Sequence, residues 1–481
     1  MGRVNKLACM NVTDYHQNHE TWLGKRVLVL GAARQGLALA RFLAERGAKV
    51  IINDKQNPDQ LVEAQRSLAE YPIQWVMGSH PLELLENVAA VFVSGGVPLT
   101  IPIVVEARQR GIPLSNDTQI LLEHTPATVI GITGSAGKTT TTTLTGRIAQ
   151  AACDQSLTNK AYRRVWVGGN IGTPLINEII EMTDEDLLVL ELSSFQLELV
   201  NKSPRFAAVL NITPNHLDRH GTMESYIEAK AHILDYQNPS DFAILNRDDD
   251  GAWGLKANVK GKLTTFGKEP DHGYMGTYLE DEWVTFWDGN QEIPLIPLQE
   301  IGLRGEHNIM NVLAACAIAL AAGIPAWACR VGVSGFKGVP HRLEFVRNWH
   351  GADWYNDSIA TAPERSIAAI KSFAEPLVLL LGGRDKNLPW SDFARLAVER
   401  CRSLILFGEA AEKIERAIQE VAIENCPPIT RCKDLEEAVR VAARVVQTGD
   451  VVLLSPGGTS FDEFRDFEER GECFRKWVMN L

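Results

Sequence analysis

Residues 129–142 read VIGITGSAGKTTTT, and this stretch decides the fold. An apolar run at 127–132 leads into a glycine-rich turn, and residues 144–151 beyond it have helical character. Glycines let successive N–H groups point at an anion, and the dipole of a following helix favours negative charge there. The stretch therefore predicts a nucleotide triphosphate site, in which Lys138 reaches the outer phosphates and the Thr139 hydroxyl reaches Mg²⁺.

The loop does not match the strict pattern G-x-x-x-x-G-K-[ST], whose first glycine would stand where the chain has Ile132. Gly131 and Gly134 lie on either side of that position. A glycine turn that contains a lysine by chance is the structural alternative. The strand before the turn and the helix after it favour the nucleotide site.

The composition is that of a globular protein with several domains. A length of 481 residues exceeds the size at which one hydrophobic core stops growing and is typical of about three domains. The formal net charge of −12 speaks against a nucleic-acid partner, which basic patches would bind. Anionic small molecules are compatible with this charge, because local fields and Mg²⁺ can overrule it.

Neither export nor membrane insertion is expected. The eight cysteines are scattered without a C-x-x-C pair, which favours free thiols in a reducing cytosol. The polar segment up to about residue 20 lacks the apolar core of a signal peptide. Residues 311–328 carry no charge, but they are rich in alanine and interrupted by Gly323-Ile324-Pro325, which predicts a buried helix and its end. We therefore expect a cytoplasmic protein.

The first part of the chain opens like a Rossmann-like unit. Strands are expected at 26–30 and 49–53, with a glycine turn and a helix between them. Asp54 follows the second strand, where an acidic residue could meet a ribose. The glycine turn makes NAD(P) an alternative ligand here, but Ala33 stands where the middle glycine of the dinucleotide fingerprint belongs, so the match is imperfect. A further strand at 89–93 and its glycine turn would lie at the same sheet edge.

Two strands of the central part end in polar residues. A strand at 187–190 delivers Glu191, and a strand at 207–210 leads to His216. Functional groups of open α/β sheets gather at the carboxyl ends of strands, so we expect both side chains beside each other near the phosphate site. Lys230 falls within an expected helix at 223–233, where a lysine alone indicates a solvated surface group.

The last part of the chain repeats the alternation of strands and helices. Strands are expected around residues 354–355, 377–381, 403–407 and 451–454, with helical segments such as 390–400 between them. This alternation predicts another parallel sheet.

These motifs resemble the Mur ligase family, ATP-dependent amide-forming enzymes of peptidoglycan precursor synthesis, over nearly the whole chain. The motifs that carry the resemblance are GITGSAGKTTTT, GGNIGTP, ELSSFQLE, NITPNHLDRH, the EAK around Lys230, LRGEHNIMN, GVPHRLE, YNDSIAT, LGGRDK and SPGGTSFDEFRDFEERG. ELSSFQLE, LGGRDK and the ending from Ser455 to Phe467 look most like the branch that adds D-glutamate to UDP-N-acetylmuramoyl-L-alanine. The resemblance implies this activity, through an acyl-phosphate intermediate, in a chain expected to be a monomer.

The resemblance also implies an α/β fold of three domains. A Rossmann-like domain at 1–126 would bind the UDP substrate, and a P-loop ATPase-like domain with a parallel sheet at 127–337 would bind ATP. A Rossmann-like domain at 338–481 would bind the amino acid. Closure of these domains around the substrates is expected.

The functional residues that the resemblance implies fall into four groups. ATP would contact Gly134, Ser135, Ala136, Gly137, Lys138, Thr139, Thr140, Asn308, Arg342 and Asp357. The UDP substrate would contact Gly31, Arg34, Gln35, Asp54, Ser94, Gly95, Asn170 and His216. Glutamate would contact Thr361, Lys386, Ser460 and Phe467. Thr139 and Glu191 would hold one Mg²⁺, and His216 would hold a second together with Lys230 carbamylated by CO₂; Lys138, Glu191, His216 and Lys230 would serve catalysis.

Some positions depart from the family pattern. Ile359 and Ala362 stand where many D-glutamate-adding members have lysine and asparagine, residues 457–459 replace a more usual Ala-Cys-Ala, and Ala136 stands where asparagine is common. The missing cation at Ile359 keeps an L-glutamate-adding relative open. The sequence is also compatible with another Mur ligase, an enzyme similar to folylpolyglutamate synthases, a dehydrogenase, or a P-loop nucleotide-binding protein without ligase activity.

Overall fold

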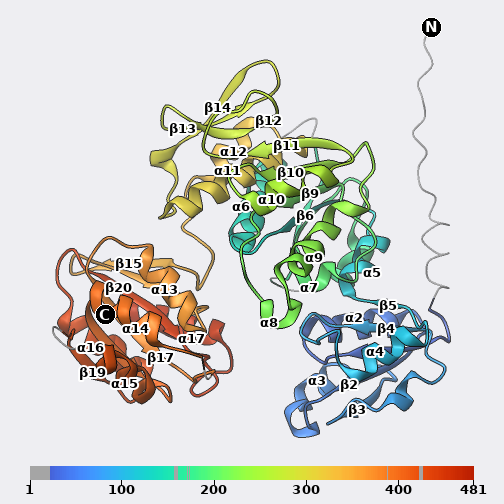
Figure 1. Ribbon diagram of the computed structural model, residues 1–481, viewed down its shortest axis with the longest axis horizontal. Coiled ribbons are helices and arrows are strands. Elements are labelled where there is room, and N and C mark those ends of the chain that lie inside the picture. The colour runs from blue at the N-terminus through green and yellow to red at the C-terminus, as the bar shows by residue number, and fades with distance from the viewer. Residues whose placement is uncertain (1–21, 156–160, 171, 173, 387, 422–425) are drawn as a thin grey trace. The chain divides into compact units, whose positions relative to one another are not determined.

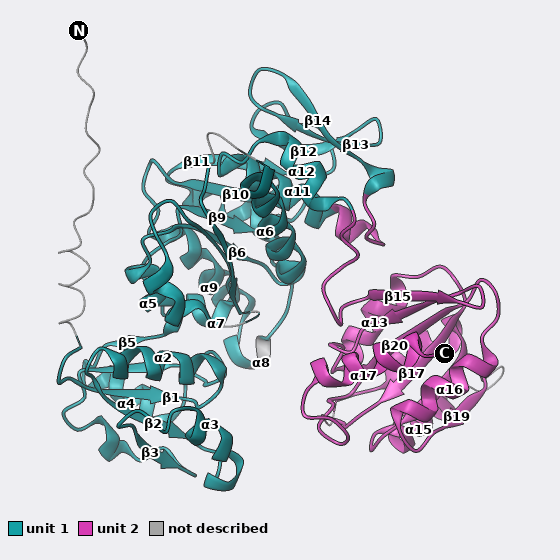
Figure 2. Ribbon diagram, turned by 180° about the vertical axis from the view of Figure 1, so that it is seen from behind, with its two compact units in different colours: residues 1–300, 310–334 teal, residues 301–309, 335–481 magenta. Residues whose placement is uncertain are grey.

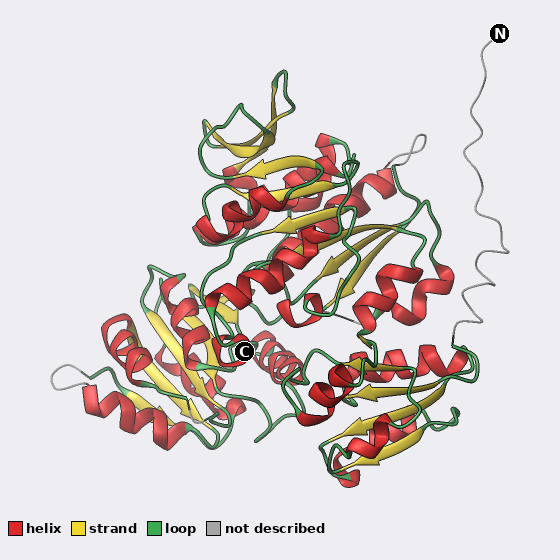
Figure 3. Cartoon of the chain, turned by 45° about the vertical axis from the view of Figure 1, so that its right-hand side comes forward, coloured by secondary structure: helices red, strands yellow, loops and turns green. Residues whose placement is uncertain are grey.

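The computed structural model describes residues 22–155, 161–170, 172, 174–386, 388–421 and 426–481. The polar tail expected up to about residue 20 lies outside these residues. The chain divides into two compact units, residues 1–300 with 310–334 and residues 301–309 with 335–481 (Figure 2). In the part that the structure describes, the strands form three sheets, and helices pack against each of them (Figures 1 and 3).

The first unit begins with a parallel sheet in the order β3-β2-β1-β4-β5. Its strands are β1 (Arg26–Leu30), β2 (Lys49–Asp54), β3 (Gln74–Met77), β4 (Ala90–Val93) and β5 (Leu114–Ser115). Its helices are α2 (Arg34–Glu45), α3 (Val62–Ser67), α4 (Pro102–Gln109) and α5 (Asp117–His124). The strands expected at 26–30, 49–53 and 89–93 are confirmed.

The apolar run in β1 follows from burial on both faces of this sheet. Val27 and Val29 belong to one buried cluster, while Leu28 and Leu30 belong to another. Successive side chains of a strand point to opposite faces, so each face of β1 has its own core. A strand covered on both faces is a continuous apolar run, which is the pattern that the sequence shows.

The central sheet of the first unit has the order β14-β13-β12-β11-β10-β9-β6-β8-β7. The strands from β7 to β12 pair in parallel, and they are β6 (Thr128–Thr133), β7 (Val165–Gly169), β8 (Leu187–Glu191), β9 (Phe206–Val209), β10 (Phe242–Asn246), β11 (Lys262–Phe266) and β12 (Met275–Glu280). β13 (Trp283–Trp287) and β14 (Glu292–Pro297) then continue the sheet antiparallel. The expected parallel sheet is confirmed, and this antiparallel extension adds to it.

Helices of different lengths accompany the central sheet. They are α6 (Lys138–Gln155), α7 (Ser194–Leu197), α8 (Leu217–His220), α9 (Met223–Asp235), α10 (Asp250–Gly254), α11 (Glu306–Ala321) and α12 (Ala326–Val333). The alanine-rich segment forms the buried helix α11, which ends before Gly323 as expected. Small residues let helices approach closely, since a Cβ on Gly332 of α12 would lie 2.5 Å from the Ile148 Cα of α6. Among the described helices, none has both the length and the apolar character needed to cross a bilayer.

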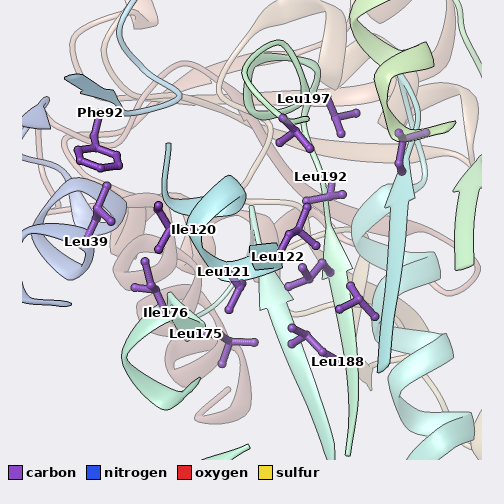
Figure 4. Packing of buried hydrophobic residues seen from close by; sticks show 14 of the residues in the cluster. Leu39, Phe92, Ile120, Leu121, Leu122, Leu175, Ile176, Leu188, Leu192 and Leu197 are labelled. Carbon is purple, nitrogen blue, oxygen red and sulfur yellow. The ribbon is translucent and has the colours of Figure 1, made fainter. Parts of the chain in front are cut away.

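Helix α5 joins the cores of the two sheets in the first unit. Figure 4 shows its side chains Ile120, Leu121 and Leu122 between Phe92 of β4 on one side and Leu188 of β8 on the other. All of these residues belong to one buried cluster. The N-terminal and central sheets therefore share a continuous hydrophobic core.

The second unit contains a sheet in the order β15-β16-β20-β17-β18-β19. Its strands are β15 (Glu344–Trp349), β16 (Ala352–Asn356), β17 (Leu377–Gly382), β18 (Cys401–Phe407), β19 (Ile429–Arg431) and β20 (Val451–Gly457). Its helices are α13 (Pro363–Lys371), α14 (Ser391–Arg400), α15 (Ala411–Val421), α16 (Leu435–Val445) and α17 (Phe467–Met479). The expected strands and the helix at 390–400 are confirmed, and β15 pairs antiparallel at one edge.

Candidate active site

The glycine-rich loop connects β6 to α6 and is packed against α11. Gly137 has a φ of 79°, in the left-handed region that favours glycine. A Cβ at this position would lie 2.2 Å from the Asn311 Oδ1, an atom that also accepts a hydrogen bond from the Thr141 hydroxyl at 3.3 Å. The close approach of α11 therefore requires glycine at 137.

The segment after β9 fixes the other side of the loop. The Ser135 N–H donates to the Asn211 backbone oxygen at 2.9 Å, and the Ala136 N–H donates to the Asn211 Oδ1 at 2.8 Å. These two amides therefore serve to hold the loop, and the next residues open α6, which begins at Lys138 and whose N-terminus favours negative charge. Asn211 was missed in the sequence, although its place directly after a strand was a signal.

Lys138 folds back over the loop. Its Nζ donates to the Gly134 backbone oxygen at 2.8 Å and contacts the Ser135 backbone oxygen at 3.4 Å. The ammonium thus stays within the loop that is predicted to hold phosphates.

Glu191 lies at the carboxyl end of β8 with 2% of its surface exposed. Its Oε2 accepts a hydrogen bond from the Thr139 hydroxyl at 2.8 Å, and its Oε1 accepts one from the Asn170 Nδ2 at 2.9 Å. Thr139 and Glu191, the residues predicted to hold one Mg²⁺, are therefore in direct contact. A carboxylate and a hydroxyl are oxygen ligands of the kind that Mg²⁺ prefers, so this pair fits the ion.

Lys230 lies inside the protein with 1% of its surface exposed, so the sequence-based interpretation as a surface group is wrong. Its Nζ donates to the Gly134 backbone oxygen at 3.0 Å and lies 4.7 Å from the centre of the Tyr226 ring. Burial and, to a lesser extent, the charge of Lys138 lower the pKa of Lys230 to about 6, although Glu191 acts in the opposite direction. Near neutral pH the amine is therefore largely uncharged.

His216 follows β9 and is exposed, with a φ of 54°. Its ring packs edge-on against Phe195, which lies in α7 shortly after Glu191, with 5.2 Å between the ring centres. β6 lies between β8 and β9 in the sheet, and this ring contact joins the segments that follow the two outer strands. Within the described residues, no group of three or more His, Cys, Asp and Glu side chains could hold a metal ion.

The turn between β1 and α2 is held by Asp54. Its Oδ2 accepts a hydrogen bond from the Ala32 N–H and its Oδ1 accepts one from the Gln56 N–H, both at 2.8 Å. In this structure the carboxylate orders the backbone of the turn. Its contact with a ribose stays a prediction.

Other residues predicted to bind the UDP substrate lie around the same turn. Ser94 is buried, and its hydroxyl donates to the Gly31 backbone oxygen at 3.3 Å. Arg34 is exposed at the start of α2. The Gln35 Nε2 donates to the Gly169 backbone oxygen at 3.4 Å, and Gly169 precedes Asn170.

Gly95 connects this turn with the segment after β9. Its backbone oxygen accepts a hydrogen bond from the Arg219 Nη1 at 3.2 Å, and the Arg219 guanidinium stacks on Phe195. The structure thus brings the predicted UDP-binding residues near one another in the first unit. Arg219 was missed in the sequence.

In the second unit, Asp357 is buried at the end of β16. Its Oδ2 accepts a hydrogen bond from the Ser455 hydroxyl at 2.9 Å, and its Oδ1 accepts one from the Leu343 N–H at 3.2 Å. Burial raises the pKa of Asp357 to about 7, against these hydrogen bonds and against the positive charges of Arg342 and Arg365. Asn308 also belongs to this unit, and its Nδ2 donates to the Arg304 backbone oxygen at 2.7 Å.

The residues predicted to bind glutamate lie on loops of the same unit and, for Phe467, at the start of α17. The Lys386 Nζ donates to the Thr361 hydroxyl at 3.3 Å, so these two are brought together. Ser460 is buried in the segment after β20, and the Phe467 ring lies 6.3 Å from that of His341.

Arg470 is fully buried behind these loops and was missed in the sequence. It donates to the Ser358 hydroxyl and backbone oxygen and to the Gly458 backbone oxygen. Burial lowers the pKa of Arg470 to about 10.

Family models match three consecutive parts of the chain. Residues 25–116 match "Mur ligase MurD-like, N-terminal domain", residues 132–319 match "Mur ligase middle domain", and residues 341–458 match "Mur ligase, glutamate ligase domain". Together these matches cover more than half of the sequence.

Curated relatives match nearly the full length. A UDP-N-acetylmuramoylalanine–D-glutamate ligase of Symbiobacterium thermophilum is 42% identical over 460 residues, which are 95% of this chain and 99% of the relative. Ligases of the same name from Pelotomaculum thermopropionicum and Koribacter versatilis are 40% and 39% identical over 95% of this chain and 98% of theirs.

Solved structures share the fold at low sequence identity. The UDP-N-acetylmuramate-alanine ligase of Thermotoga maritima superposes with a TM-score of 0.58 at 17% identity, over 95% of this chain and 99% of that one. MurF from Acinetobacter baumannii gives a TM-score of 0.56 at 18% identity, over 97% and 98%.

Proposed function

This chain belongs to the Mur ligase family, and on that premise we propose that it adds D-glutamate to UDP-N-acetylmuramoyl-L-alanine in peptidoglycan precursor synthesis, using ATP. Relatives that carry the name of this ligase match 95% of the chain. The observation that carries the proposal in the structure is the buried contact of Thr139 with Glu191 beside the glycine-rich loop, because it supplies oxygen ligands where phosphates would lie.

The reaction that we propose has two steps. The carboxylate of the UDP substrate attacks the γ-phosphate of ATP, which gives an acyl phosphate and ADP. The amine of glutamate then attacks the acyl carbon, and phosphate leaves as the amide forms. The family resemblance supplies this sequence of steps.

The residues of the first unit would favour these steps through charge. The first-turn N–H groups of α6 and the Lys138 ammonium would bind the phosphate oxygens, and Lys138 would offset the negative charge that develops. Thr139 and Glu191 would hold Mg²⁺, which supplies further positive charge when bound. Asn170 would keep the Glu191 carboxylate oriented through its hydrogen bond.

We propose that Lys230 is carbamylated. Its buried amine has a pKa lowered to about 6, so the nitrogen lone pair is available at neutral pH. Attack of that nitrogen on CO₂ forms an N–C bond and releases one proton, which leaves a carbamate anion. An unmodified lysine offers no oxygen to a metal, whereas the carbamate would join His216 in holding a second Mg²⁺.

We propose domains at 1–126, 127–337 and 338–481 that bind the UDP substrate, ATP and glutamate, respectively. Their support is that a separate sheet lies in each range. We further propose that the protein is a cytoplasmic monomer. We also propose that it does not bind nucleic acid, which the net charge of −12 disfavours as a partner.

Phosphate release tests the proposed function. Purified protein is incubated with ATP, Mg²⁺ and UDP-N-acetylmuramoyl-L-alanine, and D-glutamate or L-glutamate is added in parallel. The expected result is release that depends on D-glutamate. Dependence on L-glutamate would show that the protein is specific for the L-isomer. This arm is included because Ile359 stands where many D-glutamate-adding members have lysine. Release that requires no amino acid, or none at all with either, would refute the proposal.

A further inference from the structure

Two cationic side chains of the second unit reach the loop between β16 and α13. Arg365 lies in the first turn of α13, and its Nη1 donates to the Ile359 backbone oxygen at 3.1 Å. Lys386, from the loop after β17, donates to the Thr361 hydroxyl at 3.3 Å. The guanidinium and the ammonium therefore approach residues 359–361 from different elements.

Cations and anions both surround Arg365. The side chains of Arg365 and Lys386 are both exposed to solvent. Partial loss of hydration and the charge of Arg342 lower the pKa of Arg365, while Asp357 and Glu364 act in the opposite direction. The pKa of Lys386 is lowered by partial loss of hydration and by the charge of Arg365, against Glu364. Asp357 offsets only part of the positive charge at neutral pH, because burial raises its own pKa to about 7, and Glu364 offsets a further part.

One donor of this cluster lacks an acceptor. The Arg342 Nε is buried and has no hydrogen-bond partner among the residues that the structure describes. Cations gathered in this way repel one another, and a bound anion would relieve that repulsion. The cluster thus has the charge and the hydrogen-bonding capacity of an anion site.

We propose that Arg365 binds a carboxylate of the incoming glutamate beside Lys386, and so supplies the positive charge that Ile359 lacks. This inference rests on the proposed function. Glutamate carries two carboxylates, and Lys386 alone offers one positive charge to them. A guanidinium matches the planar geometry of a carboxylate and can donate two parallel hydrogen bonds to it. The bond to the Ile359 backbone oxygen places this group next to residue 359, the position at which many D-glutamate-adding relatives have lysine.

Steady-state kinetics with Arg365→Gln test the inference. Loss of a charged hydrogen bond predicts that KM for glutamate rises about ten- to a hundredfold, while KM for ATP stays within about twofold. Ile359→Lys in the same variant restores part of the affinity for glutamate. Lys371→Gln is the matched control, since it removes an exposed cation at the other end of α13 and leaves both KM values unchanged.

The outcomes separate this inference from the proposed function. A rise in KM for ATP instead of glutamate would assign Arg365 to a phosphate group and overturn the inference, as would unchanged KM values. A wild-type protein without glutamate-dependent phosphate release would refute the proposed function, and the inference would fall with it. If Arg365→Gln does not fold, Arg365→Lys serves in its place, with an expected intermediate rise in KM for glutamate.

Discussion

At the scale of single residues, Lys230 places an amine where a charge is unfavourable. Between pH 6 and 10.5 the unfolded chain binds a proton at this lysine that the folded chain largely does not. The free energy of unfolding therefore falls as the pH is lowered through this range. The unfavourable contribution is absent above pH 10.5 and complete below about pH 6.

Lys230→Met is accordingly expected to be more stable than the wild type in the absence of ligands and bicarbonate. Replacing a buried ionisable group by an apolar one predicts a gain of roughly 1–3 kcal/mol, which grows as the pH is lowered from 10 to 6. Thermal denaturation across this range measures it. Lys371→Met, at an exposed position, is the control without a gain. Equal stability of the Lys230→Met and wild-type proteins at pH 6 would contradict the burial.

Removal of the lysine should also abolish ligation if the carbamate is needed. Lys230→Ala is expected to fold, to lose nearly all activity, and to recover part of it with short-chain carboxylic acids, which replace the lost carboxylate. A ¹³C resonance from protein equilibrated with ¹³CO₂ would report the carbamate independently of activity. Full activity of Lys230→Ala would exclude the carbamate from the mechanism.

Some residues of the candidate site could be predicted from the sequence, and others could not. Glu191 and Thr139 could be predicted because one ends an apolar strand and the other follows the loop lysine. The burial of Lys230 could not be predicted from its helix alone, since it depends on the loop that packs over it. Arg470 was missed for the same reason: its partners Ser358 and Gly458 lie in other loops.

At the scale of elements, the loop from β6 to α6 depends on a glycine for two reasons. Gly137 has a positive φ, and it makes room for the Asn311 Oδ1. Gly323, after α11, has the same φ of 79°, but no atom lies within 4 Å of the position that a Cβ would take there. Alanine at position 323 would therefore suffer backbone strain alone, whereas alanine at position 137 would suffer the same strain and a steric clash.

Gly137→Ala is expected to weaken ATP binding by more than about tenfold, because the loop must move away from α11. Gly323→Ala is expected to lower the free energy of unfolding by about 1 kcal/mol through backbone strain alone, and to leave ATP binding unchanged. Equilibrium titration with a fluorescent ATP analogue measures the binding. Thermal denaturation measures the stability of both variants. Equal ATP affinity of both variants would show that the contact with Asn311 is unimportant.

Elements with a strong local pattern were predicted well. The buried parallel strands are continuous apolar runs bounded by glycine or polar residues, and the strand at Arg26–Leu30 was predicted with its observed limits. The β13–β14 extension was missed because its strands mix exposed and buried positions and pair antiparallel next to a parallel sheet. Helix α12 was missed because the expected helix end at Pro325 is also the start of the next helix.

At the scale of the whole molecule, the two compact units have separate buried clusters. Heating is therefore expected to give more than one calorimetric transition. The residues proposed to bind the UDP substrate all lie in the first unit, so that substrate is expected to raise the temperature of one transition. At about one hundred times its Kd, a ligand adds about 2.7 kcal/mol to the stability of the part that binds it. A single transition that shifts as a whole would contradict this expectation.

The shared core around α5 explains why the first unit contains two sheets. Motifs placed the N-terminal and central sheets in separate domains, and the family models match them separately. Which side chains connect them depends on tertiary packing that one sequence does not reveal. Ile120, Leu121 and Leu122 look like an ordinary apolar helix segment until their neighbours are known.

The end strand of the central sheet has a consequence for behaviour in a crowded solution. β14 is the last strand in the sheet order, and it contains Pro294 and Pro297. Proline has no N–H to offer, so an approaching strand of another molecule would find fewer donors along this edge. This edge of the sheet with the most strands among the described residues is therefore a poor template for edge-to-edge aggregation. We expect it to resist aggregation of the protein at high concentration.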